Sequence, residues 1–233
     1  MRVAIMQPYF FPYIGYFQLI NSVEMFVIYD NIKFTKKGWI HRNRIIINGI
    51  DKYISLQLKN DSDFLNVNER FLSASFLEGR KKVLRCIYAS YHKAPFFNNV
   101  YSIIEKCINY SETNLFAYIE YSLIQICKYL NINTLIVISS EINCDHNTKS
   151  QDRIIAICKA LDATTYINAI GGQNLYNKED FNAQKIELKF LKSQLITYNQ
   201  FDNEFIPWLS IIDVMMFNSK EEIRGMLDQY ELI

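Results

Sequence analysis

The stretch IMQPYFFPYIGYF, residues 5–17, decides the fold of this chain. The apolar run over residues 3–6 is short, as in a buried central strand, and Gln7-Pro8 ends it because proline has no N–H for a ladder bond. Pro12 suits the first turn of a helix that we expect over residues 13–21. A strand, a stiff aromatic loop and a helix start would point backbone N–H groups at one place. The stretch predicts a shaped pocket; an aromatic plug closing one end of the core is the alternative.

The rest of the chain predicts an α/β fold with a mostly parallel sheet and flanking helices. Short apolar runs predict strands over residues 25–29, 134–138, 164–170 and 186–190, the last of them at a sheet edge. Asn48-Gly49 between β-branched runs predicts a β-hairpin near residues 44–57. Because strands and helices alternate at both ends of the chain and no linker is evident, we expect one domain, 1–233.

Helical spacing of apolar residues predicts a helical segment in the middle of the chain, about residues 78–131. Ser111 is the predicted cap of its last helix. Two capping boxes are expected further on, and they pair Thr148 with Gln151 and Ser219 with Glu222.

Composition bounds the function. Half of the 233 residues are hydrophobic, 15% are aromatic and the net charge is +1, so the chain is too apolar for disorder and DNA is not an expected partner. No apolar run reaches membrane-spanning length and no signal peptide is recognisable, so we expect a cytoplasmic protein. Five scattered cysteines indicate reduced thiols, and no metal-ligand spacing occurs.

Polar residues at the ends of the first two predicted strands are candidate ligands for a substrate. Gln7, Tyr9 and Tyr13 leave the first strand, and Asp30 leaves the second. In open α/β sheets, ligands bind outside the carboxyl ends of strands. Gln7 bonded only to backbone, and Asp30 as a turn cap, are the alternatives.

The densest cluster of chemically useful side chains lies in residues 33–44. It supplies candidate substrate-binding and catalytic residues, namely Lys33, Trp39, His41, Arg42, Asn43 and Arg44. Cations and tryptophan suit a phosphate or a planar base, and an imidazole suits a general base. Strand alternation places His41 and Asn43 on one face, and Arg42 and Arg44 on the other. A solvated basic hairpin is the alternative.

Two later segments add candidate substrate-binding residues. Asn168, Gly171, Gly172 and Gln173 end a predicted strand, where paired glycines let backbone N–H groups face an anion or a sugar. Asp213 follows Ser210 by three residues, and a helix cap formed by Ser210 is the favoured reading of that pair. Cys144, Asp145 and His146 are adjacent along the chain and so are not expected to form a catalytic dyad.

Together these stretches resemble the WbqC-like protein family. The resemblance rests on QPYFFPYIG (residues 7–15), Tyr29-Asp30, GWIHRNR (38–44), Ala94-Pro95-Phe96, YIN with IGGQ (166–173), and LSIID (209–213). It runs through almost the whole chain, although basic Lys33 stands where an acidic or amide residue is common in the family.

The resemblance implies a transferase of O-antigen or other surface-polysaccharide biosynthesis. The expected reaction is N-acylation or N-aminoacylation of a dideoxy amino sugar linked to a nucleotide, with acyl-CoA or aminoacyl-tRNA as donor; no cofactor is evident, and tRNA is expected only as a donor. On this hypothesis His41 is the base, Asp30 orients the substrate, Asn43 and Gln7 donate to the oxyanion, and Arg42 or Arg44 binds the diphosphate.

Two other functions stay open. The strand, Pro-rich loop and helix start also resemble adenylate-forming nucleotidyltransferases, but Tyr13, Gly15 and Tyr16 stand where those carry a histidine-glycine-histidine signature. A non-catalytic binding or scaffold protein of the polysaccharide pathway is the third hypothesis.

Overall fold

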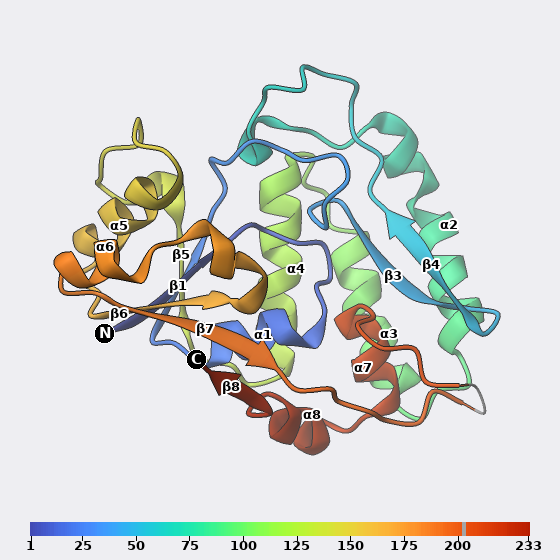
Figure 1. Ribbon diagram of the computed structural model, residues 1–233. Helices are drawn as coiled ribbons and strands as arrows, with labels where there is room; N and C mark the ends of the chain where they lie inside the picture. Colours follow the sequence, from blue (N-terminus) through green and yellow to red (C-terminus); the bar gives the residue numbers. More distant parts are fainter. Residues whose placement is uncertain (202–203) are drawn as a thin grey trace.

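A twisted, mostly parallel sheet forms the centre of the molecule (Figure 1). The computed structural model describes residues 1–201 and 204–233. Within these residues six strands form one sheet, in the order β5 (Leu135–Ile138), β2 (Met25–Ile28), β1 (Arg2–Met6), β6 (Thr165–Ala169), β7 (Glu187–Ser193) and β8 (Tyr230–Leu232). All neighbours are parallel except β7 and β8. The predicted sheet is confirmed, but β7 is not its edge because the short β8 pairs outside it.

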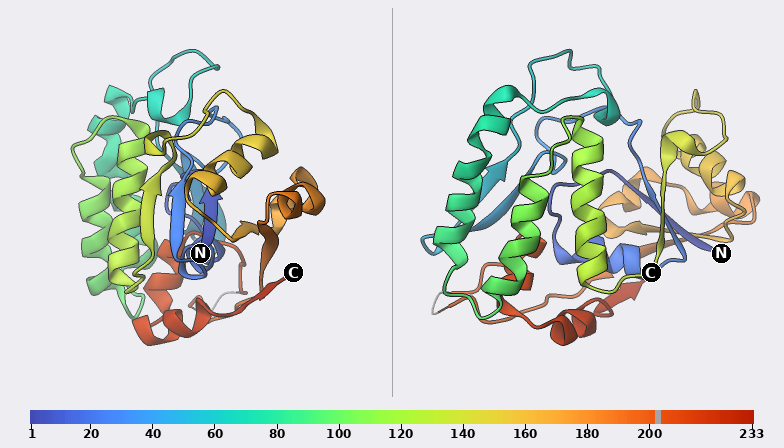
Figure 2. Two further views of the ribbon diagram at one scale, coloured as in Figure 1. Left: turned by 90° about the vertical axis from the view of Figure 1, so that its left-hand side faces the viewer. Right: turned by 180° about the vertical axis from the view of Figure 1, so that it is seen from behind.

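Helices cover both faces of the sheet (Figures 1 and 2). The helices are α1 (Ile14–Asn21), α2 (Ala74–Tyr91), α3 (Phe97–Ile108), α4 (Leu115–Tyr129), α5 (Ser150–Ala160), α6 (Lys178–Ala183), α7 (Ile211–Phe217) and α8 (Lys220–Met226), with short 3-10 helices η1 (Val67–Glu69), η2 (Ser139–Glu141) and η3 (Ile170–Leu175). Side chains alternate along β1, so Val3 packs toward α5 and α6, whereas Ala4 packs toward α1 and α4. The larger core lies on the second face.

The middle of the chain is helical, as predicted, but two predicted helix starts are wrong. Asn114 rather than Ser111 caps α4, because its side chain accepts a hydrogen bond from the backbone N–H of Ala117. The capping box expected at the start of α5 does not form. The Thr148 hydroxyl instead donates to the Asp145 carbonyl. The capping box that opens α8 forms as predicted.

A separate antiparallel hairpin, β3 (Arg42–Ile47) and β4 (Ile50–Ser55), stands beside the main sheet. Its turn is Asn48-Gly49, and both residues have positive φ angles, 55° and 76°. Asparagine and glycine tolerate that geometry best, which is why the turn could be predicted. Buried Ile45 and Ile54 join the hairpin to the larger core.

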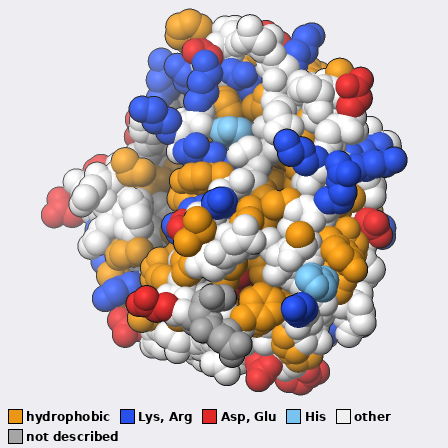
Figure 3. Space-filling view, turned by 90° about the vertical axis from the view of Figure 1, so that its right-hand side faces the viewer, with side chains coloured by type: hydrophobic (Ala, Val, Ile, Leu, Met, Phe, Trp, Pro, Cys, Tyr) orange, Lys and Arg blue, Asp and Glu red, His pale blue; other side chains and the backbone are white. Residues whose placement is uncertain are grey.

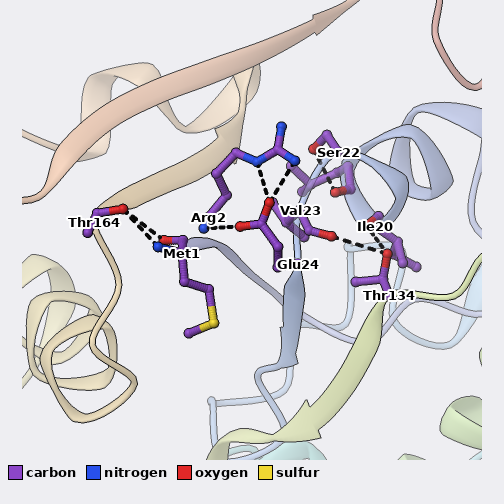
Figure 4. A network of polar contacts seen from close by, with 9 residues as sticks. Met1, Arg2, Ile20, Ser22, Val23, Glu24, Thr134 and Thr164 are labelled. Atoms are coloured by element: carbon purple, nitrogen blue, oxygen red, sulfur yellow. Dashed lines mark hydrogen bonds and ion pairs between the residues drawn. The ribbon is translucent and has the colours of Figure 1, made fainter.

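The amino ends of four parallel strands are tied together at one edge of the sheet (Figure 4). The Met1 ammonium donates to the Thr164 hydroxyl at 2.9 Å, and Arg2 forms an ion pair with Glu24 at 2.7 Å. The Thr134 hydroxyl donates to the Ile20 carbonyl at 2.8 Å. The carboxyl ends of β1, β2, β5 and β6 therefore lie together at the opposite edge.

Two further expectations concern the chain as a whole. All five cysteines carry free thiols, as predicted. Among the helices of the described residues, none is both long and apolar enough to cross a membrane.

Candidate active site

A cavity of about 870 Å³ opens where β1, β2 and β6 end. Its polar lining comprises the cations Lys33, Lys149 and Arg153, the amides Gln7, Asn31, Asn66, Gln151 and Asn168, and the hydroxyl residues Thr148 and Ser150. Its aromatic lining comprises Tyr9, Tyr13, Tyr16, Tyr29, Trp39 and Tyr176. Among the described residues that line it there is no aspartate or glutamate. The cavity is therefore cationic, rich in hydrogen-bonding groups and bounded by aromatic rings.

The loop after β1 forms one wall of this cavity and is clamped from behind. The Asn43 amide donates to the carbonyls of Phe10 and Phe11 at 3.2 and 2.9 Å. The Ser210 hydroxyl donates to the Phe11 carbonyl at 2.7 Å, and the backbone N–H of Ile211 donates to the Pro12 carbonyl. Phe11 has a φ of 42°, a conformation that L-residues adopt only when the surroundings hold it. The clamp thus shapes the wall from the side away from the ligand space.

Tyrosine hydroxyls on this wall stay protonated near neutral pH. Burial raises the pKa of Tyr9, Tyr13 and Tyr16 above the usual value. The Tyr16 hydroxyl donates to the Gln7 carbonyl at 2.9 Å, and the Tyr9 and Tyr16 ring centroids lie 5.5 Å apart. These tyrosines therefore serve as hydrogen-bond donors and stacking surfaces, not as bases.

The start of α5 forms another wall of the cavity. Lys149 is its N-cap residue, and no side chain among the described residues caps the helix. The first N–H groups of a helix have no partner within it, and the dipole makes this end positive. Lys149 and Arg153 add two full charges beside it. This wall suits an anion such as a diphosphate.

His146 holds Arg153 in place. The Arg153 guanidinium contacts the His146 Nδ1 at 3.1 Å, and the Asn31 amide contacts the same atom at 3.3 Å. The His146 Nε2 lies 2.9 Å from the carbonyl of Ile142. An imidazole that donates from Nε2 to this carbonyl leaves Nδ1 as the acceptor for both neighbours. The Arg153 guanidinium also lies over the Tyr29 ring, 5.2 Å from its centroid, in a cation–π contact.

The comparisons with known proteins agree with the resemblance noted above. Residues 7–225 match the model of the WbqC-like protein family, and the match begins at Gln7, which is one of the cavity-lining residues. The chain belongs to the WbqC-like protein family. An uncharacterized protein of Mycobacterium tuberculosis, Rv1507c, is 27% identical to it over 221 residues, which cover 93% of each chain. No solved structure matches significantly.

In this WbqC-like protein, many of the residues predicted to bind substrate line the cavity together. They are Gln7, Tyr9, Tyr13, Lys33, Trp39, Asn168, Gly171 and Gly172. The others, Asp30, His41, Arg42, Asn43, Arg44, Gln173 and Asp213, are not among its lining residues.

His41 is half-buried and does not line the cavity. Its ring packs against Phe34 at a centroid distance of 5.2 Å, and its Nδ1 is buried without a hydrogen-bond partner in the described structure. Burial, with the charges of Arg42 and Arg70, lowers the pKa of this imidazole. The site geometry therefore does not bring it into contact with a ligand in the cavity.

Asp30 is a buried anchor at the end of β2. Its carboxylate accepts from the backbone N–H of Ser140 at 2.9 Å, from the Ser140 hydroxyl at 2.7 Å and from the Asn68 amide at 2.7 Å. These bonds tie the end of β2 to η1 and η2. They position the neighbouring Asn31, which lines the cavity.

Asp213 is also buried, within α7. Its carboxylate accepts from the Tyr91 and Tyr198 hydroxyls at 2.7 and 2.8 Å and from the Gln200 amide at 2.8 Å. Burial raises the pKa of Asp213 to about 6, although these three hydrogen bonds oppose the shift. Ser210 caps α7 as predicted, since its hydroxyl accepts from the backbone N–H of Ile212.

Sequence reasoning missed the wall contributed by α5, including Lys149, Arg153 and His146. The signal that could have found them is positional. They follow β5, which is parallel to β2, so their loop must also reach the carboxyl edge of the sheet.

Proposed function

We propose that this WbqC-like protein is a cytoplasmic transferase that forms an amide on the amine of a nucleotide-linked dideoxy amino sugar. The reaction would be an N-acylation or N-aminoacylation in the biosynthesis of O-antigen or another surface polysaccharide. The acyl group would come from acyl-CoA or from aminoacyl-tRNA. Support comes from family membership and from the chemistry of the cavity.

The cavity lining is the observation that carries the proposal. A nucleotide-linked sugar needs cations for its diphosphate, flat surfaces for its base and amides or hydroxyls for its sugar. The cavity offers all three kinds of group, and its 870 Å³ falls in the range of small-molecule sites. The absence of carboxylates from its described lining leaves a diphosphate unopposed by negative charge.

The walls suggest a direction for the bound substrate. Lys149 and Arg153, at the start of α5, would hold the diphosphate. Trp39, an aromatic residue of the cavity lining, would face the base. Gln7 directly follows β1, Asn168 lies on the neighbouring strand β6, and both line the cavity, so their amides could donate to the oxyanion that forms during acyl transfer.

The experiment offers purified protein a UDP-linked or dTDP-linked 4-amino-4,6-dideoxyhexose with an acyl-CoA or an aminoacyl-tRNA. Mass spectrometry should show the gain of one acyl group on the sugar amine. Arg153→Ala should lose most of this activity, whereas Arg85→Ala, at an exposed position on α2, should keep it. If no donor gives a mass gain while the protein is folded, the transferase proposal is wrong.

An adenylate-forming reaction is the second candidate, because α1 begins directly after the loop that follows β1 and presents Gly15 to the cavity. A Cβ at Gly15 would collide with the Tyr13 ring and the Ser193 hydroxyl. The absence of a side chain at Gly15 therefore lets these two groups pack closely against the first turn of α1. With ATP and a free acyl acid added to the assay, this reaction would release pyrophosphate. Binding of the sugar nucleotide without any reaction would instead support a binding or scaffold protein.

A further inference from the structure

Positive charge is concentrated in one part of this nearly neutral chain. Residues 33–55 contain six basic residues and one acidic residue, a net charge of +5, whereas the whole chain carries +1 and the remainder therefore −4. This part comprises the loop beside the cavity and the β3–β4 hairpin. One of these cations, Lys36, is paired at 2.7 Å with Asp63, which lies outside the segment. The remaining excess of positive charge attracts a polyanion to this part of the molecule.

The outward face of the hairpin combines this charge with exposed aromatic rings. Asn43 and Ile45 are buried, so Arg42 and Arg44 point the other way, and the register sets Arg44 opposite Tyr53. The Arg42 guanidinium lies 4.6 Å from the Tyr53 ring centroid. Figure 3 shows hydrophobic side chains gathered on the side of the molecule that carries β4 and α2, with basic side chains flanking them.

Two of these rings form an open stack. Trp39 and Tyr53 lie 6.1 Å apart at 30°, and they are 38% and 52% exposed. The Arg44 guanidinium lies 5.8 Å from the Trp39 ring, and its only acidic partner among the described residues is Asp51. Guanidinium groups interleaved with aromatic faces suit a strand of stacked bases joined by phosphates.

This aromatic and cationic face continues into the cavity. Trp39 belongs to both, since it lines the cavity and stacks on Tyr53. Trp208, which is 46% exposed, packs against cavity residue Tyr13 at 6.1 Å, and its carbonyl accepts from Arg44. A chain bound along the hairpin would therefore place its end at the cavity mouth.

We propose that this hairpin face binds the single-stranded 3′ end of an aminoacyl-tRNA, which then serves as the acyl donor; the inference rests on the proposed function. The sugar amine nitrogen attacks the ester carbonyl carbon, the amide C–N bond forms and the ester C–O bond breaks. The amine loses a proton, and the departing ribose oxygen of the tRNA gains one. Acyl-CoA carries a single base and therefore would not use a row of stacking surfaces.

The first test measures RNA binding without catalysis. Fluorescence anisotropy would follow a labelled single-stranded RNA of about twelve nucleotides ending in CCA, with a duplex of the same length for comparison. We expect tighter binding of the single strand, weakened by salt. Tyr53→Thr should reduce the affinity about fivefold or more, because one stacking contact contributes about 1–3 kcal/mol.

Ile50→Thr is the matched control, since Ile50 lies on the same strand with 54% exposure but outside the ring stack. It should leave RNA binding unchanged. No binding of single-stranded RNA, or an equal loss in both variants, would overturn the inference.

A second measurement separates this inference from the proposed function. Titration of UDP reports on the cavity alone, and the amide assay with acyl-CoA and with aminoacyl-tRNA reports on the donor. UDP binding and acyl-CoA-dependent amide formation without RNA binding would overturn the tRNA donor and leave the transferase. RNA binding without amide formation from aminoacyl-tRNA would overturn the donor role itself.

Discussion

The buried carboxyl group of Asp213 should make the stability of this protein depend on pH in an unusual direction. Its pKa is raised to about 6 in the folded protein, against 3.8 for an unperturbed group. Because the folded pKa is the higher, the folded state binds the proton more tightly than the unfolded chain does. This contribution to stability is complete below about pH 4 and is lost as pH rises through about 6.

The size of the effect follows from the shift. A difference of roughly two pKa units corresponds to about 3 kcal/mol in the free energy of unfolding, at about 1.4 kcal/mol per unit. About 2 kcal/mol of it falls between pH 4.5 and pH 7.5. The side chain is fully buried, so solvent does not screen the effect.

Urea unfolding of the wild type and of Asp213→Asn at both pH values measures this term, because titrations shared by the two proteins cancel. The stability of the wild type relative to the variant should fall by about 2 kcal/mol from pH 4.5 to pH 7.5. If the variant does not fold, the carbon-13 shift of the Asp213 carboxyl in the wild type gives its pKa directly. A pKa at or below 4, or a stability difference that does not change with pH, would refute the reasoning.

Two further predictions concern the cavity. His146→Ala should raise the Kd for UDP about five- to tenfold, because the Arg153 guanidinium loses a hydrogen-bond acceptor that contributes about 1 kcal/mol or slightly more. Adding His146→Ala to Arg153→Ala should cause no further loss of affinity. Additive effects of the two changes would contradict the positioning role of His146. Gly172→Ala should weaken UDP-sugar binding about two- to tenfold in the same titration, because the new Cβ would collide with the Asn168 amide and displace it. Gly171→Ala is the matched control, since its Cβ meets nothing within 4 Å; equal effects of the two changes would contradict the collision.

Much of the fold could be predicted because local chemistry decides it. Asn48-Gly49 demands a tight hairpin, and the proline residues around the first loop end one element and begin the next. The position of β7 inside the sheet could not be predicted. It depends on a three-residue strand at the end of the chain, which carries too short a pattern to recognise.

The candidate site could be predicted in part for a related reason. Alternation correctly separated Asn43 from Arg42 and Arg44, but it does not say what each face of a strand meets. The inward face meets the back of the aromatic loop, so Asn43 holds the wall of the cavity without lining it. The wall formed by the start of α5 was not predicted, because the sequence led us to expect that a capping box would satisfy the first N–H groups of this helix. In the structure the N-cap residue of α5 makes no side-chain capping hydrogen bond.

Binding of a nucleoside diphosphate to the cavity tests the central claim most directly. Calorimetric titration of UDP should show binding to the wild type and to Arg85→Ala, with at least a tenfold weaker affinity for Arg153→Ala, because a charge-assisted hydrogen bond contributes about 1.5–3 kcal/mol. Equal affinities for all three proteins, or no heat with a folded wild type, would contradict the assignment of this cavity to a nucleotide-linked substrate.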